Sequence, residues 1–282
     1  MCKSVDSATY LGYKEVTLSD EALADFYSSG MSNDAIGCLT NEYLVICNEL
    51  GESVDKLRWS GSEFVKISKK PFVTKFGGKV TARNLQQELA FDLVQNNDIT
   101  VKFLAGRFGS GKTFILSAAA VQMVENGVFD KIVFIRNNVE VRHSQPLGYL
   151  PGSMDEKLSV WCMDLADHLG GDAGLEMLMR QRIIEATHLG FLRGRDIKNS
   201  IILVNEAENL TKEHIQLIIS RAGEGSQVWL DGDLKQRDAE IFVKNSGMAC
   251  AIEKLAGHPR FGYVKLLKSE RSETAAMADL LD

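Results

Sequence analysis

Residues 106–113 constrain the fold of this chain more than any other part of the sequence. They read Gly-Arg-Phe-Gly-Ser-Gly-Lys-Thr and match the pattern G-x-x-x-x-G-K-[ST]. An apolar run precedes them and a helix-forming stretch follows, so the sequence predicts a strand, a glycine loop and a helix in that order. Glycines let a backbone wrap closely around an anion, and the N–H groups at a helix N-terminus point towards phosphates.

This pattern is the phosphate cradle of P-loop NTPases, and we expect it to bind ATP together with Mg²⁺. The Lys112 side chain would bridge the outer phosphates, and the Thr113 hydroxyl would ligate Mg²⁺. A chance match in a glycine-rich turn is the alternative, and the flanking strand and helix argue against it. The expected nucleotide-binding residues of the loop are Gly106, Arg107, Phe108, Gly109, Ser110, Gly111, Lys112 and Thr113.

Short apolar runs alternate with helical stretches over the rest of the chain, which indicates an α/β fold. Continuous apolar runs of this kind are typical of strands that are buried on both faces of a mostly parallel sheet. Helices are expected at residues 84–95 and 113–125. Strands are expected at residues 99–104, 131–135, 201–204, 227–230 and 263–267.

Residues 1–80 differ from the remainder, and we interpret them as a small β-rich accessory module before a P-loop domain at 81–282. Residues 42–47 and 63–68 are short and rich in β-forming side chains. A helix is expected at 19–28 with Ser19 as its N-cap, and a polar stretch follows at 69–79. The function of this module cannot be inferred from its residue types.

Composition excludes several classes of protein. The formal net charge is −6, so a nucleic-acid partner would have to bind a local basic groove. The five cysteines are odd in number and scattered without a C-x-x-C pair, which argues against disulfides and a structural zinc. The chain has no signal-like N-terminus and no apolar run of the roughly 18 residues that a membrane span needs. We therefore expect a cytoplasmic protein that does not enter a membrane.

A second motif follows the apolar run at residues 201–204, which ends in Asn205 and Glu206. Ligands bind at this edge of a parallel sheet. Position 205 lies on the metal side, where most P-loop enzymes have an aspartate. We expect Glu206 to polarise the attacking water as a general base, which favours hydrolysis over phosphate transfer to another acceptor. The alternative for Glu206 is a carboxylate that stabilises a helix N-terminus.

A third apolar run ends in Asp231, Gly232 and Asp233, with Gln236 just beyond. We expect these polar groups to lie between the phosphate cradle and the second motif. Gln236 could then sense the terminal phosphate, and Asp233 could orient the metal or the water. Taken alone, Asp-Gly-Asp is also typical of a simple turn.

Together these motifs resemble the PhoH family of P-loop ATPases, and most closely the ATPase half of proteins that fuse a PIN nuclease to a PhoH domain. The resemblance runs from about Tyr10 to Leu281 and is strongest from Ala82 onward. Its further motifs are Ala82-Arg83-Asn84 with Gln87, residues 147–152 with Glu156-Lys157, residues 191–195, residues 206–211, residues 221–225, and Glu270-Arg271-Ser272.

The resemblance implies a RecA-like core related to superfamily 1 helicases, ATP hydrolysis coupled to single-stranded RNA, and assembly into a ring that is often hexameric. It also implies that Gln87 contacts the adenine, with Arg83 close to the base. Arg221 or Arg271 would be the arginine that meets the transition-state charge, either within its own subunit or across a subunit interface. For Arg221 the alternative is a cap on the C-terminus of its own helix.

Three features depart from the family pattern. The resemblance starts in the region that joins nuclease to ATPase, so we expect no PIN nuclease in this sequence. Asn137 follows Arg136 at a position where the family usually has proline. The usual Asp-Glu pair is Asn205-Glu206, while Asp231 stands where the family has threonine. We hypothesise that Asp231 restores the negative charge next to Mg²⁺, and the alternative is independent drift at the two positions.

Two basic clusters are candidate RNA contacts: Arg193 with Arg195, and Arg142 with His143. The neighbouring aromatic side chains could stack on bases, although packing in the core is the interpretation that residue type favours. These aromatic residues are Tyr149, Trp161 and Phe191.

The sequence thus predicts an RNA-dependent ATP hydrolase. The alternatives are a nucleotide-gated RNA- or protein-binding module in which Asn205 weakens hydrolysis, and, less favoured, a P-loop kinase.

Overall fold

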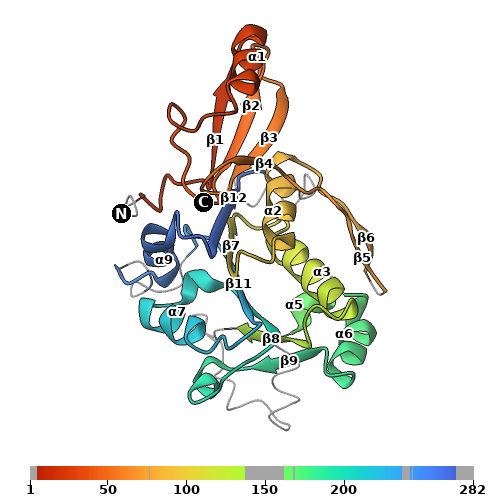
Figure 1. Ribbon diagram of the computed structural model, residues 1–282. Helices are drawn as coiled ribbons and strands as arrows, with labels where there is room; N and C mark the ends of the chain where they lie inside the picture. The colour runs from red at the N-terminus through yellow and green to blue at the C-terminus, as the bar shows by residue number, and fades with distance from the viewer. Residues whose placement is uncertain are drawn as a thin grey trace, which may run out of the picture.

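The structure is a computed structural model that describes residues 5–75, 77–136, 162–167, 169–236, 242 and 244–270 (Figure 1). Its centre is a six-stranded sheet in which every strand pair is parallel. The strand order is β12-β7-β11-β10-β8-β9. The strands are β7 (Val101–Gly106), β8 (Lys131–Arg136), β9 (Ile184–Thr187), β10 (Ser200–Asn205), β11 (Gln227–Gly232) and β12 (Phe261–Leu266).

Helices cover both faces of this sheet, as continuous apolar strands require. Alternate residues of β7, β8, β10, β11 and β12 enter two separate hydrophobic clusters, so that Leu104 packs on one face and Phe103 on the other. One face carries α2 (Leu85–Gln95), α3 (Lys112–Glu125), α5 (Met163–Ala166) and α6 (Gly171–Arg180). The opposite face carries α7 (Lys212–Ile219) and α9 (Gly247–Leu255) with the short 3-10 helices η2 (Leu189–Leu192) and η3 (Ala207–Asn209) (Figure 1).

The strand order determines which loops meet. All six strands run in the same direction, so their carboxyl ends lie at one edge of the sheet. β11 lies between β7, which leads into the glycine loop, and β10, which leads to Glu206. The expected α/β fold with a RecA-like parallel core is confirmed, and the Asp-Gly-Asp segment does lie between the other two motifs.

The N-terminal residues form a separate four-stranded sheet in the order β1-β2-β3-β4. Its elements are β1 (Tyr13–Thr17), α1 (Asp20–Ser28), β2 (Tyr43–Cys47), β3 (Ser53–Trp59) and β4 (Phe64–Lys66). The predicted N-cap is confirmed, because the Ser19 hydroxyl accepts the backbone N–H of Ala22 at 3.3 Å. The stretch from 69 to 79 contains a short hairpin of β5 (Phe72–Thr74) and β6 (Gly78–Val80), and β5 packs against α3.

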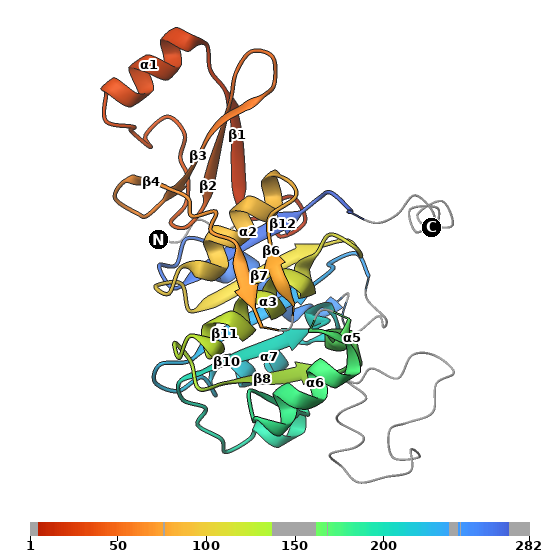
Figure 2. The same ribbon diagram turned by 90° about the vertical axis from the view of Figure 1, so that its right-hand side faces the viewer.

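This N-terminal sheet is fastened to the core beside α2 and β12 (Figure 2). Asp92 of α2 accepts hydrogen bonds from the Tyr43 hydroxyl at 3.0 Å, from Arg58 Nε at 3.0 Å and from the Ser68 backbone N–H at 2.7 Å. The side-chain amide of Asn41 donates to the carbonyls of residues 259 and 261, both at 2.9 Å. The accessory sheet therefore braces the helix whose first turn lies at the glycine loop.

No helix in the described part of the chain combines the length and the apolar character that a bilayer crossing requires.

Candidate active site

The glycine loop wraps tightly between β7 and α3. Gly106, Gly109 and Gly111 all have positive φ angles, of 153°, 72° and 89°. A Cβ at Gly106 would lie 2.4 Å from the carbonyl oxygen of Leu266 in β12, so only glycine fits there. No side chain caps the N-terminus of α3, and its first turn has no acidic residue. The N–H groups at this uncapped end of the helix therefore suit binding of an anion.

The two side chains that follow the loop are already close to its backbone. Lys112 Nζ donates to the carbonyl oxygens of Gly106 at 2.6 Å and of Arg107 at 3.0 Å. The Thr113 hydroxyl donates to Oδ2 of Asp231, at the end of β11. A bound phosphate would compete with the carbonyls for the ammonium group, because charge-assisted hydrogen bonds are the stronger ones.

A small cavity of about 170 Å³ opens beside these groups at the carboxyl edge of the sheet. Both Lys112 and Glu206 line it, so the cradle lysine and the expected general base face the same space. The order β7-β11-β10 explains this meeting, because the three strands end side by side. The other lining residues are Phe108, Thr113, Asn205, Glu208, Asp231, Gly232 and Asp233.

Glu206 lies directly after β10 with a positive φ of 56°, an uncommon conformation for a residue with a side chain. Its Oε1 accepts a hydrogen bond from Arg136 Nη2 at 2.7 Å. Arg136 is opposite Asn205 in the parallel register of β8 and β10. The alternative role at a helix N-terminus is not supported, since the Glu206 side chain makes no capping bond to η3. The carboxylate instead pairs with Arg136 at the edge of the cavity.

Asp231 and Asp233 contribute buried carboxylates to the same cavity. Asp231 is 1% exposed, and burial raises its pKa to about 6. One oxygen of each side chain, Oδ1 of Asp231 and Oδ2 of Asp233, has no hydrogen-bond partner among the described residues. Buried polar atoms in proteins are usually paired, so each points to a group that binds there. Gln236 follows on the same turn but does not line the cavity.

Glu208 is a cavity residue that the sequence analysis did not single out. Its Oε2 accepts the backbone N–H of Asp233 at 3.1 Å, and burial raises its pKa to about 8, with the charges of Asp231 and Glu206 adding to the effect. Gly232 makes room for it, because a Cβ there would lie 2.5 Å from Glu208 Oε2. The one available signal was the spacing of Glu206 and Glu208, which flank a single alanine.

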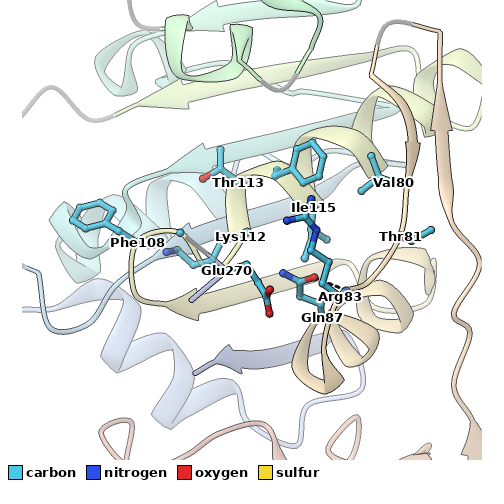
Figure 3. Close-up of a pocket in the computed structure, with 12 residues that line it drawn as sticks. Val80, Thr81, Arg83, Gln87, Phe108, Lys112, Thr113, Ile115 and Glu270 are labelled. Carbon is cyan, nitrogen blue, oxygen red and sulfur yellow. Dashed lines mark hydrogen bonds between the residues drawn. The ribbon is translucent and has the colours of Figure 1, made fainter. Parts of the chain in front are cut away.

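A larger cavity of about 420 Å³ lies on the other side of the loop, between α2, α3 and the segment after β12 (Figure 3). Gln87 reaches it from α2: Nε2 donates to the Ser110 carbonyl at 3.0 Å, and Oε1 accepts the Arg83 backbone N–H at 2.8 Å. Arg83 lines it as well. Gln87 therefore contacts the glycine loop directly from the wall of this cavity.

Glu270 closes one side of the larger cavity and was also missed as a site residue. Its backbone N–H donates to the Gly109 carbonyl at 2.9 Å, and Asn84 Nδ2 donates to its Oε1 at 2.8 Å. The Asn84 hydrogen bond lowers the pKa of Glu270, so the carboxylate stays charged. The next residue, Arg271, lies outside the described residues.

Arg221 is distant from the active site of its own chain. It follows the carboxyl end of α7, and its carbonyl accepts the Ile197 N–H just before β10 begins. That position is the amino edge of the sheet, opposite to the edge of the glycine loop. Arg221 is not among the residues that line the small cavity of its own chain, and its catalytic role stays a prediction.

The candidate RNA contacts are only partly described. Arg195 pairs with Glu185 at 2.8 Å, while Arg193 is exposed. Phe191 is 54% exposed, so the core-packing interpretation is wrong for this aromatic residue. Several further residues of interest lie outside the described residues, namely Asn137, Arg142, His143, residues 147–152, Glu156, Lys157 and Trp161.

The site fits a nucleotide with its metal rather than a metal alone. In the described residues, no group of three or more His, Cys, Asp or Glu side chains is arranged to hold a metal ion. Mg²⁺ in nucleotide sites is commonly held by one or two protein ligands together with phosphate oxygens and water. The uncapped helix, the loop glycines and the unpartnered Asp231 Oδ1 suit that arrangement.

The fold and the site define a P-loop NTPase with a RecA-like core. Residues 79–279 match the family described as PhoH-like protein, and the chain belongs to this family. It is 32% identical to Protein PhoH2 of Bacillus subtilis over 292 residues, which cover 96% of this chain and 64% of that protein. It is 36% identical to Protein PhoH2 of Mycolicibacterium smegmatis over 199 residues, which cover 69% of this chain and 45% of that protein.

The chain therefore spans less than two thirds of the length of these relatives. Among solved structures, the Pif1 helicase from Candida albicans shows 13% identity and a TM-score of 0.38, over 72% of this chain and 44% of that chain. This similarity is too weak to support an inference about activity.

Proposed function

We propose that this protein binds ATP with Mg²⁺ and hydrolyses it. The observation that supports this most directly is the small cavity lined by both Lys112 and Glu206. A cradle without a carboxylate nearby would suit binding alone. A carboxylate in the same space gives an attacking water a proton acceptor.

Some residues of the site would bind the phosphates and the metal, and others would act on the attacking water. The amides of the glycine loop and of the first turn of α3 would bind the phosphates, with Lys112 turning from the Gly106 and Arg107 carbonyls towards them. The Thr113 hydroxyl would ligate Mg²⁺, which neutralises charge that develops on the phosphate oxygens. Glu206 would accept the proton of the attacking water. Asp233 would orient the metal or the water, and Gln236 would respond to the terminal phosphate from the adjoining turn.

The ion pair between Arg136 and Glu206 has a consequence for turnover. A guanidinium 2.7 Å from the carboxylate holds it in one place. It also competes with water for the same oxygen. We therefore expect a slow basal rate, with turnover increasing when a partner draws Arg136 away from Glu206.

The larger cavity suits the nucleoside. Gln87 lies in its wall together with Arg83 and Glu270, between the loop and α2. Gln87 is 5% exposed and tied to the Ser110 carbonyl, so adenine contacts there would be transmitted to the loop backbone.

RNA and other subunits are the proposed partners. The exposed Arg193 and Phe191 provide a charge for a phosphate and a ring for a base. Arg221, at the opposite edge of the sheet, and Arg271 are candidates for the arginine that completes a neighbouring site in a ring such as a hexamer. We place this activity in the cytoplasm.

Two observations favour a second candidate, a nucleotide-gated binding module with weak hydrolysis. Asn205 is uncharged at the metal-side end of β10, and Glu206 is paired with Arg136. Such a protein would form a stable ATP complex and release little phosphate.

The test is phosphate release from ATP and Mg²⁺, with and without single-stranded RNA, for the wild-type protein and for Lys112→Ala. We expect turnover that RNA stimulates and that Lys112→Ala abolishes through loss of ATP binding. Wild-type turnover equal to that of Lys112→Ala would reject the hydrolase, and a stable ATP complex in that case would favour the binding module.

A further inference from the structure

We propose that Asp231, at the end of β11, supplies the carboxylate that faces the Mg²⁺ of the nucleotide in this chain, and that Asn205 at the end of β10 does not. The inference rests on the proposed function, because it assigns a residue within the same ATP site. It assigns a carboxylate next to the metal, a contact that neither the glycine loop nor the general base was proposed to supply.

The first support is position. β11 is hydrogen-bonded to β7, the strand that leads into the glycine loop, and Asp231 is opposite Leu104 in that register. This places Asp231 next to the base of the loop. Its Oδ2 accepts the Thr113 hydroxyl, the group that ligates Mg²⁺ in P-loop sites. A carboxylate hydrogen-bonded to a metal ligand orients that ligand and places a negative charge beside the cation.

The second support is the other oxygen. Asp231 is 1% exposed, and its Oδ1 has no hydrogen-bond partner within the described residues. A buried carboxylate with an unpaired oxygen is costly unless a cation or a donor binds there. Asp231 lines the small cavity, so the unpaired oxygen lies beside the space where the outer phosphates and Mg²⁺ would bind.

The third support is the bond to Thr113, because Asp233, the other cavity carboxylate with an unpartnered oxygen in the described residues, bonds the backbone instead. Glu206 pairs with Arg136, and Glu208 accepts the Asp233 backbone N–H. Asp233 Oδ1 accepts the backbone N–H of residue 235 at 2.9 Å. Asn205 lines the cavity but carries no charge. Among the carboxylates of the cavity in the described chain, Asp231 is the one for which a bond to Thr113 is recorded.

The ends of β10 and β11 lie next to each other at the small cavity. β10 and β11 are adjacent and parallel, with Val204 opposite Leu230, so Asn205 and Asp231 end neighbouring strands one step beyond that pair. A carboxylate on either strand would face the same cavity.

The experiment measures the Mg²⁺ dependence of ATP binding, which does not require turnover. ATP affinity would be titrated by calorimetry in Mg²⁺ and in excess EDTA for the wild type, Asp231→Asn and Asp231→Thr. The fourth protein is the reciprocal variant Asn205→Asp with Asp231→Thr. Binding of Mn²⁺ to each ATP complex would be followed by electron paramagnetic resonance. Asp130→Asn, an exposed change of the same chemistry at the start of β8, is the matched control.

We expect Asp231→Asn and Asp231→Thr to weaken metal binding by the ATP complex roughly 10- to 100-fold, while ATP affinity in EDTA stays within about twofold. The reciprocal variant should recover most of the metal affinity. Unchanged metal affinity in Asp231→Asn, with a thermal unfolding profile like that of the wild type, would overturn the proposal. A reciprocal variant as weak as Asp231→Thr would overturn it as well.

The same measurements distinguish failure of the metal assignment from failure of the proposed ATP hydrolysis. If the wild type binds ATP and metal but releases no phosphate, the proposed function fails and the metal contact is still measured. If the wild type hydrolyses ATP and Asp231→Asn keeps full metal affinity, only the metal assignment fails.

Discussion

Glu208 shows how one buried side chain can make stability depend on pH. Burial raises its pKa from 4.5 to about 8 in the folded chain. Between these two values the folded chain keeps a proton that the unfolded chain has lost, so stability falls as the pH rises across this window and levels off above it. Each pKa unit of separation corresponds to about 1.4 kcal/mol.

We expect Glu208→Gln to remove this dependence, because the amide is neutral at every pH. In metal- and nucleotide-free protein, the variant should be close to the wild type in stability at about pH 4 and more stable than the wild type at about pH 9. Urea unfolding across this range measures the difference. Parallel stability curves for the two proteins would show that Glu208 does not titrate in this window.

The residues of the glycine loop were predictable, because their chemistry depends on local spacing. Glu270 was not, because it reaches the larger cavity through a bond to Asn84, 186 positions away in the chain. Glu208 was hidden for a different reason: only the backbone turn after β11 reveals its contact with Asp233. Arg221 lies at the edge of the sheet opposite to the glycine loop because of the direction in which its segment of the chain runs. Residue type alone does not indicate that direction.

At the scale of elements, the helix α2 links the N-terminal sheet to the nucleotide cavity. Asp92 receives three hydrogen bonds from that sheet and the segment after it, and one comes from the largely buried Arg58. Removing the carboxylate would leave the largely buried charge of Arg58 without the ion pair to Asp92. We expect Asp92→Ala to lower the free energy of unfolding by about 3 kcal/mol.

Denaturant unfolding of Asp92→Ala measures this loss, with Asp25→Ala as the control because Asp25 is exposed on α1. The control should change stability by no more than about 0.5 kcal/mol. Equal stability of the two variants would mean that the junction between sheet and helix contributes little.

Five of the parallel strands in the described residues were predictable from their apolar runs, although their ends differ from the prediction by one or two residues, and β9 at the sheet edge was not predicted. Elements with half-exposed faces were missed. β1 alternates between buried and accessible residues, and β5 and β6 are three residues each. Such segments gain their strand conformation from partners across the sheet, which a single run of sequence does not reveal.

At the scale of the whole molecule, the position of Arg221 makes a prediction about assembly. If Arg221 completes the site of a neighbouring subunit, Arg221→Ala subunits keep an intact cradle and Lys112→Ala subunits keep an intact arginine. Each variant alone should be inactive, and mixed oligomers should recover ATP turnover. Mixing labelled subunits and measuring phosphate release checks this, and no recovery in proven mixed oligomers would assign the arginine to another residue.

Glu206 is proposed to act as the general base for water that attacks a phosphate held by Lys112 in the same cavity. The measurement is single-turnover ATP cleavage together with ATP affinity for the wild type, Glu206→Gln and the exposed control Glu224→Gln. We predict that Glu206→Gln binds ATP within about threefold of the wild type but cleaves it at least about 100-fold more slowly, while Glu224→Gln matches the wild type. Cleavage by Glu206→Gln at the wild-type rate would exclude Glu206 as the general base.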